Sequence, residues 1–438
     1  MRRVSTCCKK MSCTRREFLA GSAALAALWD GLAAASPDAR VFEDASGRAS
    51  DFLICRRLHL DICGRLPTRA EVDRFVGSGD PDKAAKLVDE LLASEAYADY
   101  WSMRYCDMLR VKSEFPINLW PNAVYVYHRW IRNAILKDMP WDAFAQALLM
   151  GRGSNFRVPE SNFLRATAMK TPEGLSTVAS ETFLLAPTEK YARYFSRVAW
   201  KPTREWKEEI VYLKDGPRTD TPGAFAELLT GPLAAEFHAA PVRRVHWWVF
   251  GSLPKADRLG EWRRAFERGG LRLKPLLRHV FTSSAYLAGP IRGRFPARRL
   301  DAEVLDDALA SFTHRKRDFQ SIAPEPYTFL PPLRKSVLIE DGSISNAFLL
   351  RFGRPSRDAG TLEERKNEIT AKQRLYLLTS ATLWKSLGNV GDDIESVFLR
   401  LLSRPPTREE AYLAERHGLT GQLLSWYIVN SREFLYRI

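Results

Sequence analysis

The 438-residue sequence has few of the residues that most often bind metals, cofactors or oxyanions. It has seven histidines, and none lies at the spacing of a metal-binding pair. It also has no Cys-x-x-Cys-His element for haem, no His-Glu-x-x-His element for zinc, no Gly-x-Ser-x-Gly nucleophile elbow and no phosphate-binding glycine loop. We therefore expect no cofactor and no bound metal, and the sequence favours a role other than catalysis.

Long hydrophobic runs are absent as well, because no stretch approaches the roughly 20 apolar residues that cross a bilayer. A shorter Ala-rich run follows two arginines near the N-terminus and ends in small residues. This order predicts a twin-arginine export signal over residues 1–35, and it excludes an integral membrane span once the signal is removed. The signal residues are Arg15, Arg16, Phe18 and Leu19. We expect a folded protein in the periplasm, in the cell envelope or outside the cell.

Cysteine is scarce beyond the signal, where only Cys55, Cys63 and Cys106 remain. An odd number allows at most one internal disulfide in an oxidising compartment. Cys55 and Cys63 lie eight residues apart on one predicted helix, about 12 Å along its axis, which is beyond disulfide reach. A bridge from Cys106 to either of them and three buried free thiols both remain open.

Acidic residues are fewer than basic ones, and the net charge is +14. The signal holds six basic and two acidic residues, so the mature chain keeps a charge of +10. For an exported protein the relevant anions are acidic or sulfated polysaccharides, cell-wall polymers and lipid headgroups rather than nucleic acid. The basic residues are scattered, with short clusters at 292–299 and 314–317, which is typical of a solvated surface.

The most informative feature present is a helical pattern that occurs three times, over residues 56–97, 243–286 and 397–434. Each copy has an apolar helix ending at Gly or Ser, a proline-led turn into a second helix, and a third helix followed by Ser-x-x-aromatic. Thr68 with Glu71 and Thr407 with Glu410 predict capping boxes at the second helix. Capping chemistry alone can make helical hairpins look alike, but the matched order of all three segments favours an internal repeat.

These signals predict a mainly α fold with two helical domains built on recurring three-helix units. A linker over 36–45 leads into an N-terminal domain over 46–215, and a C-terminal domain follows over 216–438. Segment 313–360 is rich in proline and glycine and is expected to be long and irregular, a feature that is often functional. Few short strands are expected, one of them at 208–213.

Several motifs resemble a two-domain family of unknown function that is abundant in planctomycetes and verrucomicrobia and often fused to a cytochrome-c-like domain. Those resembling its first domain are Arg56-Arg57-Leu58-His59-Leu60-Asp61, Gly64-Arg65-Leu66-Pro67-Thr68, 101–110, Tyr127-His128-Arg129-Trp130-Ile131 and Asp138-Met139-Pro140-Trp141. Those resembling its second domain are Arg299-Leu300-Asp301-Ala302-Glu303, Phe352-Gly353-Arg354-Pro355-Ser356-Arg357 and Asn430-Ser431-Arg432-Glu433-Phe434-Leu435.

The resemblance implies membership of a family without an agreed activity, often encoded beside a sulfatase-like exported partner. Many members carry a Cys-x-x-Cys-His-like element in the first domain. The corresponding region here, 177–189, contains no cysteine, so haem bound there is not expected.

The densest mixture of polar and aromatic residues runs from Arg110 to Arg132, with a second stretch at 152–157. Cationic donors beside aromatic rings suit sugar faces and sulfate or carboxylate groups. They suit equally a buried network that joins two helices. The candidate binding residues are Arg110, Lys112, Glu114, Asn118, Trp120, His128, Arg129, Asn155 and Arg157.

Other polar groups are expected to be structural. His59 and His246 occupy equivalent repeat positions, which favours hydrogen bonding over metal binding. Adjacent carboxylates at 208–209, 306–307 and 392–393 should point apart, so we do not expect them to act as an acid/base pair.

Three functional hypotheses follow. The first is an exported helical binding or scaffold protein that acts on or beside acidic polysaccharide, or with a partner enzyme. The alternative is a hydrolase of sulfated or acidic glycans whose site combines 110–132 with the irregular segment. A third, an electron-transfer module, requires a cofactor for which the sequence offers no site.

Overall fold

The computed structural model describes residues 39–438 apart from residue 45, 292–294, 324–327 and 392. The predicted export signal and the linker up to residue 38 lie outside the described residues. Within them the fold is mainly α, as predicted, with twenty α-helices and only a few short strands. Among these described residues, no helix combines the length and the apolar character needed to cross a membrane.

The first half of the described chain contains nine α-helices. They are α2 (Ala39–Phe42), α3 (Asp51–Cys63), α4 (Arg69–Val76), α5 (Lys83–Leu92), α6 (Glu95–Met108), α7 (Pro121–Leu136), α8 (Trp141–Met150), α9 (Pro172–Leu184) and α10 (Pro222–Thr230). The second half contains α11 (Ala234–Phe250), α12 (Ala256–Arg268), α13 (Leu273–Phe281), α14 (Ala302–Thr313), α15 (Ala347–Arg351), α16 (Ala371–Thr379), α17 (Ala381–Leu387), α18 (Ile394–Leu402), α19 (Arg408–Arg416), α20 (Gly421–Val429) and α21 (Arg432–Leu435).

Short 3₁₀ helices connect some of these elements. They are η1 (Pro159–Leu164), η2 (Ala192–Phe195), η3 (Arg218–Asp220), η4 (Ser336–Leu338) and η5 (Leu362–Glu364). The strands are β1 (Gly153–Ser154), β2 (Val198–Pro202), β3 (Glu209–Leu213), β4 (Arg298–Arg299) and β5 (Tyr436–Arg437). β3 confirms the strand expected at 208–213. It pairs antiparallel with β2 and β1, and β4 pairs antiparallel with β5.

The three sequence repeats form three similar helical units: α3–α4–α5, α11–α12–α13 and α18–α19–α20. The first helix of each ends at a residue in the left-handed region, namely Gly64 (φ 61°), Gly251 (φ 71°) and Ser403 (φ 61°). Thr68 and Thr407 form the expected capping boxes at the second helices. A serine, Ser94, Ser283 or Ser431, accepts from the N–H of the aromatic residue three positions on. The repeated sequence pattern therefore corresponds to a repeated helical structure.

Two arginines of the first unit also bond it to distant parts of the chain. Arg56 of α3 donates to the Leu401 carbonyl at 2.8 Å, and Arg57 donates to the carbonyls of Tyr286, Ala288 and Ile438. Both arginines are buried. Since buried backbone carbonyls need donors, these two side chains bond α3 to the first helix of the third unit, to the segment that follows the second unit and to Ile438.

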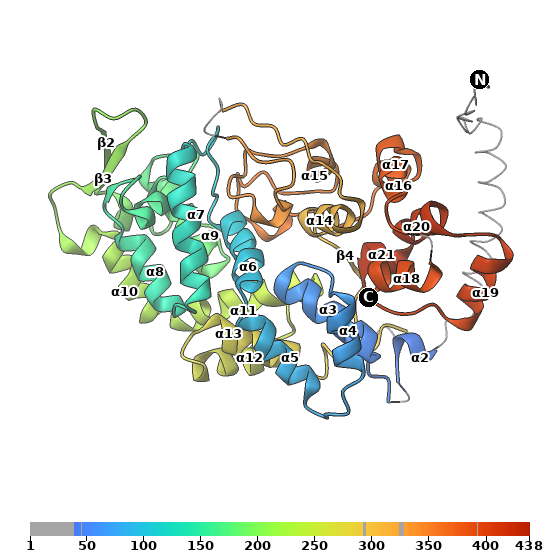
Figure 1. The fold of residues 1–438 in the computed structure, drawn as a ribbon. Helices are drawn as coiled ribbons and strands as arrows, with labels where there is room; N and C mark the ends of the chain where they lie inside the picture. The colour runs from blue at the N-terminus through green and yellow to red at the C-terminus, as the bar shows by residue number, and fades with distance from the viewer. Residues whose placement is uncertain (1–38, 45, 292–294, 324–327, 392) are drawn as a thin grey trace, which may run out of the picture.

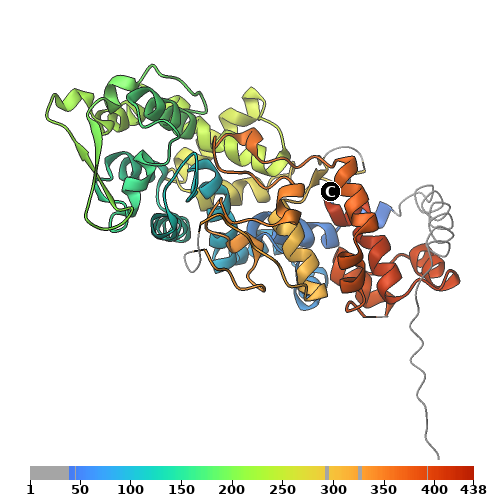
Figure 2. The ribbon, with the colours of Figure 1, turned by 90° about the horizontal axis from the view of Figure 1, so that it is seen from above.

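The molecule is elongated in both views, with the β2–β3 hairpin at one end and the C-terminal helices α16–α21 at the other (Figure 1 and Figure 2). Segment 313–360 was predicted to be irregular, and beyond the end of α14 its described residues contain only η4 and α15 as helices. Its start is bonded to α14, where the Arg317 guanidinium donates to Asp306 at 2.7 Å and to Asp307 at 2.6 Å. These adjacent carboxylates therefore reach one partner, contrary to the expectation that they point apart. Asp392 lies outside the described residues.

Candidate functional site

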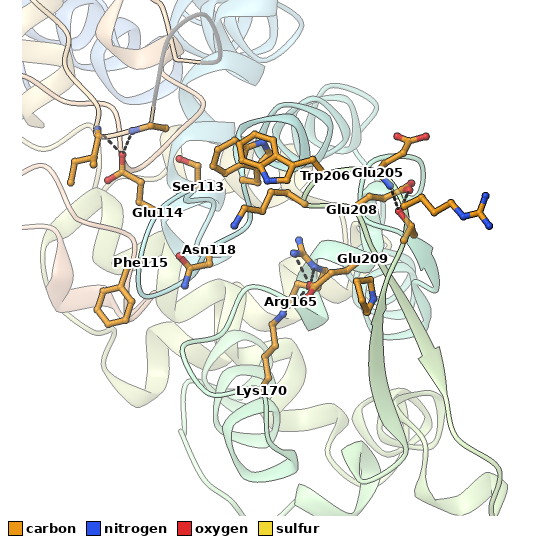
Figure 3. Close-up of a pocket in the computed structure, with 17 residues that line it drawn as sticks. Ser113, Glu114, Phe115, Asn118, Arg165, Lys170, Glu205, Trp206, Glu208 and Glu209 are labelled. Carbon is orange, nitrogen blue, oxygen red and sulfur yellow. Dashed lines mark hydrogen bonds and ion pairs between the residues drawn. The ribbon is translucent and has the colours of Figure 1, made fainter.

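A cavity of about 940 Å³ lies between the loop that precedes α7, the tip of the β2–β3 hairpin and the irregular segment. Four separate stretches of chain build its walls, at 113–120, 165–170, 202–209 and 322–323. The lining residues are Ser113, Glu114, Phe115, Asn118, Trp120, Arg165, Lys170, Pro202, Thr203, Arg204, Glu205, Trp206, Lys207, Glu208, Glu209, Ile322 and Ala323. Figure 3 shows Glu114, Phe115 and Asn118 on one side of the cavity and Glu205, Glu208 and Glu209 on the other.

The first wall is a tight loop closed on itself by backbone hydrogen bonds. The N–H groups of Leu119 and Trp120 donate to the carbonyls of Lys112 and Ser113, both at 3.2 Å. Asn118 (φ 57°) and Trp120 (φ 74°, ψ 146°) have positive φ values that L-residues rarely adopt. A backbone of this kind costs on the order of 1–3 kcal/mol and is often found at functional sites.

The opposite wall is the hairpin tip, and buried Asn155 fixes its position. The Asn155 side chain donates to the Lys207 carbonyl at 3.2 Å and accepts from the Glu209 N–H at 2.9 Å. Lys207 itself has a φ of 63°. Because Asn155 bonds both ends of the 207–209 segment, the hairpin tip presents its side chains in one arrangement.

The two walls meet through an aromatic pair. The Trp120 and Trp206 rings lie edge to face, with centroids 4.4 Å apart and planes at 75°. The Lys207 ammonium lies 5.6 Å from the Trp120 centroid and 5.8 Å from the Trp206 centroid. Trp206 remains 60% exposed. This cluster combines a large apolar surface with a positive charge at the edge of the cavity.

A buried cationic group is paired at the base of the cavity. Arg165, which is 3% exposed, donates through Nε to Glu209 Oε2 at 2.9 Å, and Lys170 Nζ donates to the same oxygen at 2.9 Å. Burial raises the pKa of the Glu209 carboxyl, but the Lys170 hydrogen bond and the Arg165 charge outweigh it, so the pKa lies below its usual value. Glu209 is therefore a carboxylate at neutral pH.

Glu208 is held in its charged form as well. Hydrogen bonds from the Ser154 and Thr203 hydroxyls lower the pKa of its carboxyl, and the Arg157 guanidinium lies 3.7 Å away. Glu208 and Glu209 thus use different partners while both line the cavity. Neither has the raised pKa that a general acid at neutral pH needs.

Glu114 attaches the irregular segment to the first wall. Its Oε1 atom accepts from the Ser321 hydroxyl at 2.7 Å, from the Ile322 N–H at 2.8 Å and from the Ala323 N–H at 3.0 Å. The Glu114 N–H donates to Ser343 Oγ at 3.0 Å. One carboxylate therefore positions Ile322 and Ala323 at the rim of the cavity.

The structure brings together only part of the predicted site. Glu114, Asn118 and Trp120 line the cavity. Asn155 lies behind its wall, and Arg157 is exposed and donates to Glu205 Oε1 at 3.1 Å.

The other four predicted site residues do not line the cavity. Arg110 is buried, and burial lowers the pKa of its guanidinium to about 10. Lys112 bonds Asp358 at 2.6 Å. His128 is half-buried, and burial lowers the pKa of its imidazole to about 3, while Arg129 is exposed on α7. Arg110 and Lys112 thus fit the other interpretation of this stretch, in which its polar side chains form a network that joins structural elements.

Sequence reasoning missed the cations at the base of the cavity and most of the hairpin tip. Arg165, Lys170, Arg204, Trp206 and Lys207 were not among the candidates, although all five line the cavity. The available signal was the Trp-Lys-Glu-Glu run beside a predicted strand, because functional side chains are often found on hairpin tips.

The histidines at equivalent repeat positions make the expected hydrogen bonds. His59 Nδ1 lies 2.8 Å from the Cys55 carbonyl, and His246 Nδ1 lies 2.6 Å from the Ser252 carbonyl. Across the part of the chain that the structure describes, no group of three or more His, Cys, Asp or Glu side chains is arranged to hold a metal ion.

Comparison with known proteins finds a family model that matches part of the chain. Residues 41–199 match the model of PSCyt2, described as a protein of unknown function (DUF1549). No curated protein and no solved structure matches the chain. The matched region corresponds to most of the predicted N-terminal domain and contains the first wall with Arg165 and Lys170. It ends before the hairpin tip and Ile322, so the cavity combines residues inside and outside the matched region.

Proposed function

We propose that this chain is an exported binding protein of the cell envelope whose cavity binds a saccharide carrying an anionic group, as in an acidic or sulfated polysaccharide. The aromatic rings of Trp120 and Trp206 offer a face for a sugar ring. The carboxylates and amide of the cavity can accept from and donate to sugar hydroxyls.

The observation that carries this proposal is the pair of cations at the hairpin tip. Arg204 and Lys207 both line the cavity, and neither makes an ion pair with any residue in the described ranges. By contrast, Arg165 and Lys170 are paired with Glu209. An anionic substituent on a sugar stacked near Trp206 would meet Arg204 and Lys207, whose side chains form no ion pair with a carboxylate of the described residues.

The alternative, hydrolysis of such a glycan, has less support. A glycosidase needs one carboxyl group that stays protonated near its working pH. Donors lower the pKa of both Glu208 and Glu209, and Glu114 already accepts three hydrogen bonds. The arrangement suits a binding site better than an acid/base pair.

The direct test is calorimetric titration of the purified mature chain with three oligosaccharides of similar length: heparin-derived, oligogalacturonate and cello-oligosaccharide. We expect at least one anionic ligand to bind at least about tenfold more tightly than the neutral one. Each mixture is also examined for shortened products. Equal affinity for all three, or no binding, contradicts the proposal, and shortened products support the hydrolase.

A matched pair of double variants locates the site. Arg204→Gln with Lys207→Gln removes two cations from the cavity. Lys255→Gln with Arg268→Gln removes two exposed cations elsewhere on the surface. The net charge changes equally, so loss of anionic binding only in the first variant assigns the effect to the cavity.

Export and partnership are separate parts of this proposal. The twin-arginine pattern supports export, and replacing Arg15 and Arg16 with lysine should retain the chain in the cytoplasm, as cell fractionation would show. The resemblance to the two-domain family suggests a sulfatase-like exported partner. Co-purification from the native envelope, with bound glycan and proteins identified together, tests that association.

A further inference from the structure

One rim of the cavity is apolar and exposed. Phe115 is 81% exposed and Ile322 is 90% exposed, the highest values among the large hydrophobic residues of the described chain. Both residues line the same cavity, together with Ala323. Scattered exposed apolar residues are ordinary, but two such residues at the edge of one cavity indicate a contact with something apolar.

These two residues come from distant parts of the chain and are linked through Glu114. Phe115 follows Glu114, whose carboxylate accepts from the backbone N–H groups of Ile322 and Ala323 at 2.8 and 3.0 Å. The Glu114 backbone is in turn bonded to Ser343. The hydrogen bonds of Glu114 thus position both residues of the apolar rim on this side of the cavity.

The cavity therefore has two chemically different ends. Phe115 lies on the side opposite Glu205 and Glu208 (Figure 3), and the hairpin-tip cations Arg204 and Lys207 flank Glu205 and Trp206 along the chain. A purely polar ligand would leave the apolar rim in water. A ligand with a charged sugar at one end and a hydrocarbon chain at the other would satisfy both ends.

We infer that the cavity binds an anionic glycolipid, with the charged sugar at the Trp206–Lys207 side and the hydrocarbon chain against Phe115 and Ile322. This inference rests on the proposed function and narrows its ligand class. A volume of about 940 Å³ is in the range of small-molecule sites, which favours one amphiphilic molecule over a protein surface.

The experiment compares three probes that share one head group. They are methyl 3-O-sulfo-galactoside, octyl 3-O-sulfo-galactoside kept monomeric, and phosphatidylcholine vesicles containing sulfatide, whose head group is the same sulfated sugar. We expect the octyl compound to bind at least about tenfold more tightly than the methyl compound, since the additional methylene groups of the octyl chain leave water on binding. Binding to sulfatide vesicles but not to plain vesicles would identify membrane-embedded glycolipid as the source. Binding of the monomer alone would identify free glycolipid.

The double variant Phe115→Ser, Ile322→Ser should bind the octyl compound only as tightly as it binds the methyl compound. Its affinity for the methyl compound should equal that of the parent protein. The matched control is Leu253→Ser with Leu375→Ser, which changes residues that are 54% and 60% exposed elsewhere on the surface. All four side chains are exposed, so folding should persist, and thermal unfolding checks this.

The outcomes separate this inference from the proposed function. Equal affinity for the methyl and octyl compounds overturns the inference and leaves saccharide binding intact. If the Phe115→Ser, Ile322→Ser variant still prefers the octyl compound, the inference is also overturned, because the hydrocarbon chain of the ligand then binds at another place on the protein. Failure of these probes together with the oligosaccharides described above overturns both.

Discussion

The Trp206 ring lies edge to face against the Trp120 ring, with centroids 4.4 Å apart. The two residues are 86 positions apart in the sequence and belong to opposite walls of the cavity. Trp120 is held by a backbone with φ 74°, whereas Trp206 sits on a hairpin tip and is 60% exposed. The pair therefore joins a strained loop to an exposed aromatic surface.

The first prediction concerns Trp206. Trp206→Ala should weaken binding of the preferred anionic saccharide by roughly tenfold or more, because the sugar loses an aromatic face. The free energy of unfolding should fall by less than about 1 kcal/mol, since the side chain is largely exposed. Calorimetric titration and urea unfolding measure the two effects. Trp384→Ala is the control, because Trp384 is 38% exposed and also packs edge to face on another tryptophan, Trp426.

The second prediction compares equivalent arginines of two repeat units. Arg404 is 3% exposed through its side chain and donates to both Glu410 and Glu433 at 2.7–2.8 Å. Arg65 donates to Glu71 in the same way, but its side chain is 33% exposed. Arg404→Met should lower the free energy of unfolding by about 3 kcal/mol, because two partly buried carboxylates lose their partner. Arg65→Met should lower it by about 1 kcal/mol or less, because solvent screens the exposed pair.

Urea unfolding of both variants at neutral pH provides the comparison. The capping boxes at Thr68 and Thr407 are unchanged in both, so differences in helix capping do not contribute. Equal losses for the two variants would show that burial of the ion pair does not determine its contribution.

Local chemistry made the helical units predictable. Their ends depend on residues close in sequence, such as Thr68 with Glu71 and Ser431 with Phe434, and these interactions form wherever the pattern occurs. The β3 strand was predictable for the same reason, because an apolar segment was followed by a turn signal.

The cavity was only partly predictable because it depends on contacts between distant segments. Glu114 is a candidate from the sequence, but its bonds to Ile322 and Ala323 join residues more than 200 positions apart. Arg110 and Lys112 have the same composition signal as Trp120 and yet point into other contacts. Composition identified the stretch, and only tertiary packing decided which of its side chains face the cavity.

The third prediction concerns Cys55, Cys63 and Cys106, the three cysteines beyond the predicted export signal, which the structure shows as free and buried. Burial raises the pKa of the Cys55 and Cys106 thiols to about 12, so neither forms the reactive thiolate at neutral pH. The folded chain without residues 1–35 should react with less than one equivalent of a thiol reagent such as DTNB, and with three equivalents in denaturant. A reducing agent should leave the midpoint of thermal unfolding unchanged. A shift of that midpoint would indicate a disulfide.

The last prediction concerns Asp307, which anchors the irregular segment to α14. Its carboxylate accepts from Arg317 and from the N–H groups of Ser336 and Val337, with Asp306 as its charged neighbour. Burial nevertheless raises the pKa of this carboxyl to about 6 from 3.8. The folded state therefore holds this proton more tightly than the unfolded state. The contribution of Asp307 is fully present below about pH 4 and is lost as the pH rises through 6.

Asp307→Asn removes this titration. Between pH 4 and pH 6.5 the free energy of unfolding of the variant, minus that of the parent protein, should therefore increase by up to about 2 kcal/mol. The difference is the quantity to measure, because carboxylates with lowered pKa values, such as Glu71 and Asp301, act in the opposite direction below pH 4 in both proteins. Asp318→Asn, an exposed position in the same segment, should show no such change. If the two proteins keep a constant difference across this range, Asp307 is ionised throughout, and the Arg317 charge then outweighs burial at this anchor.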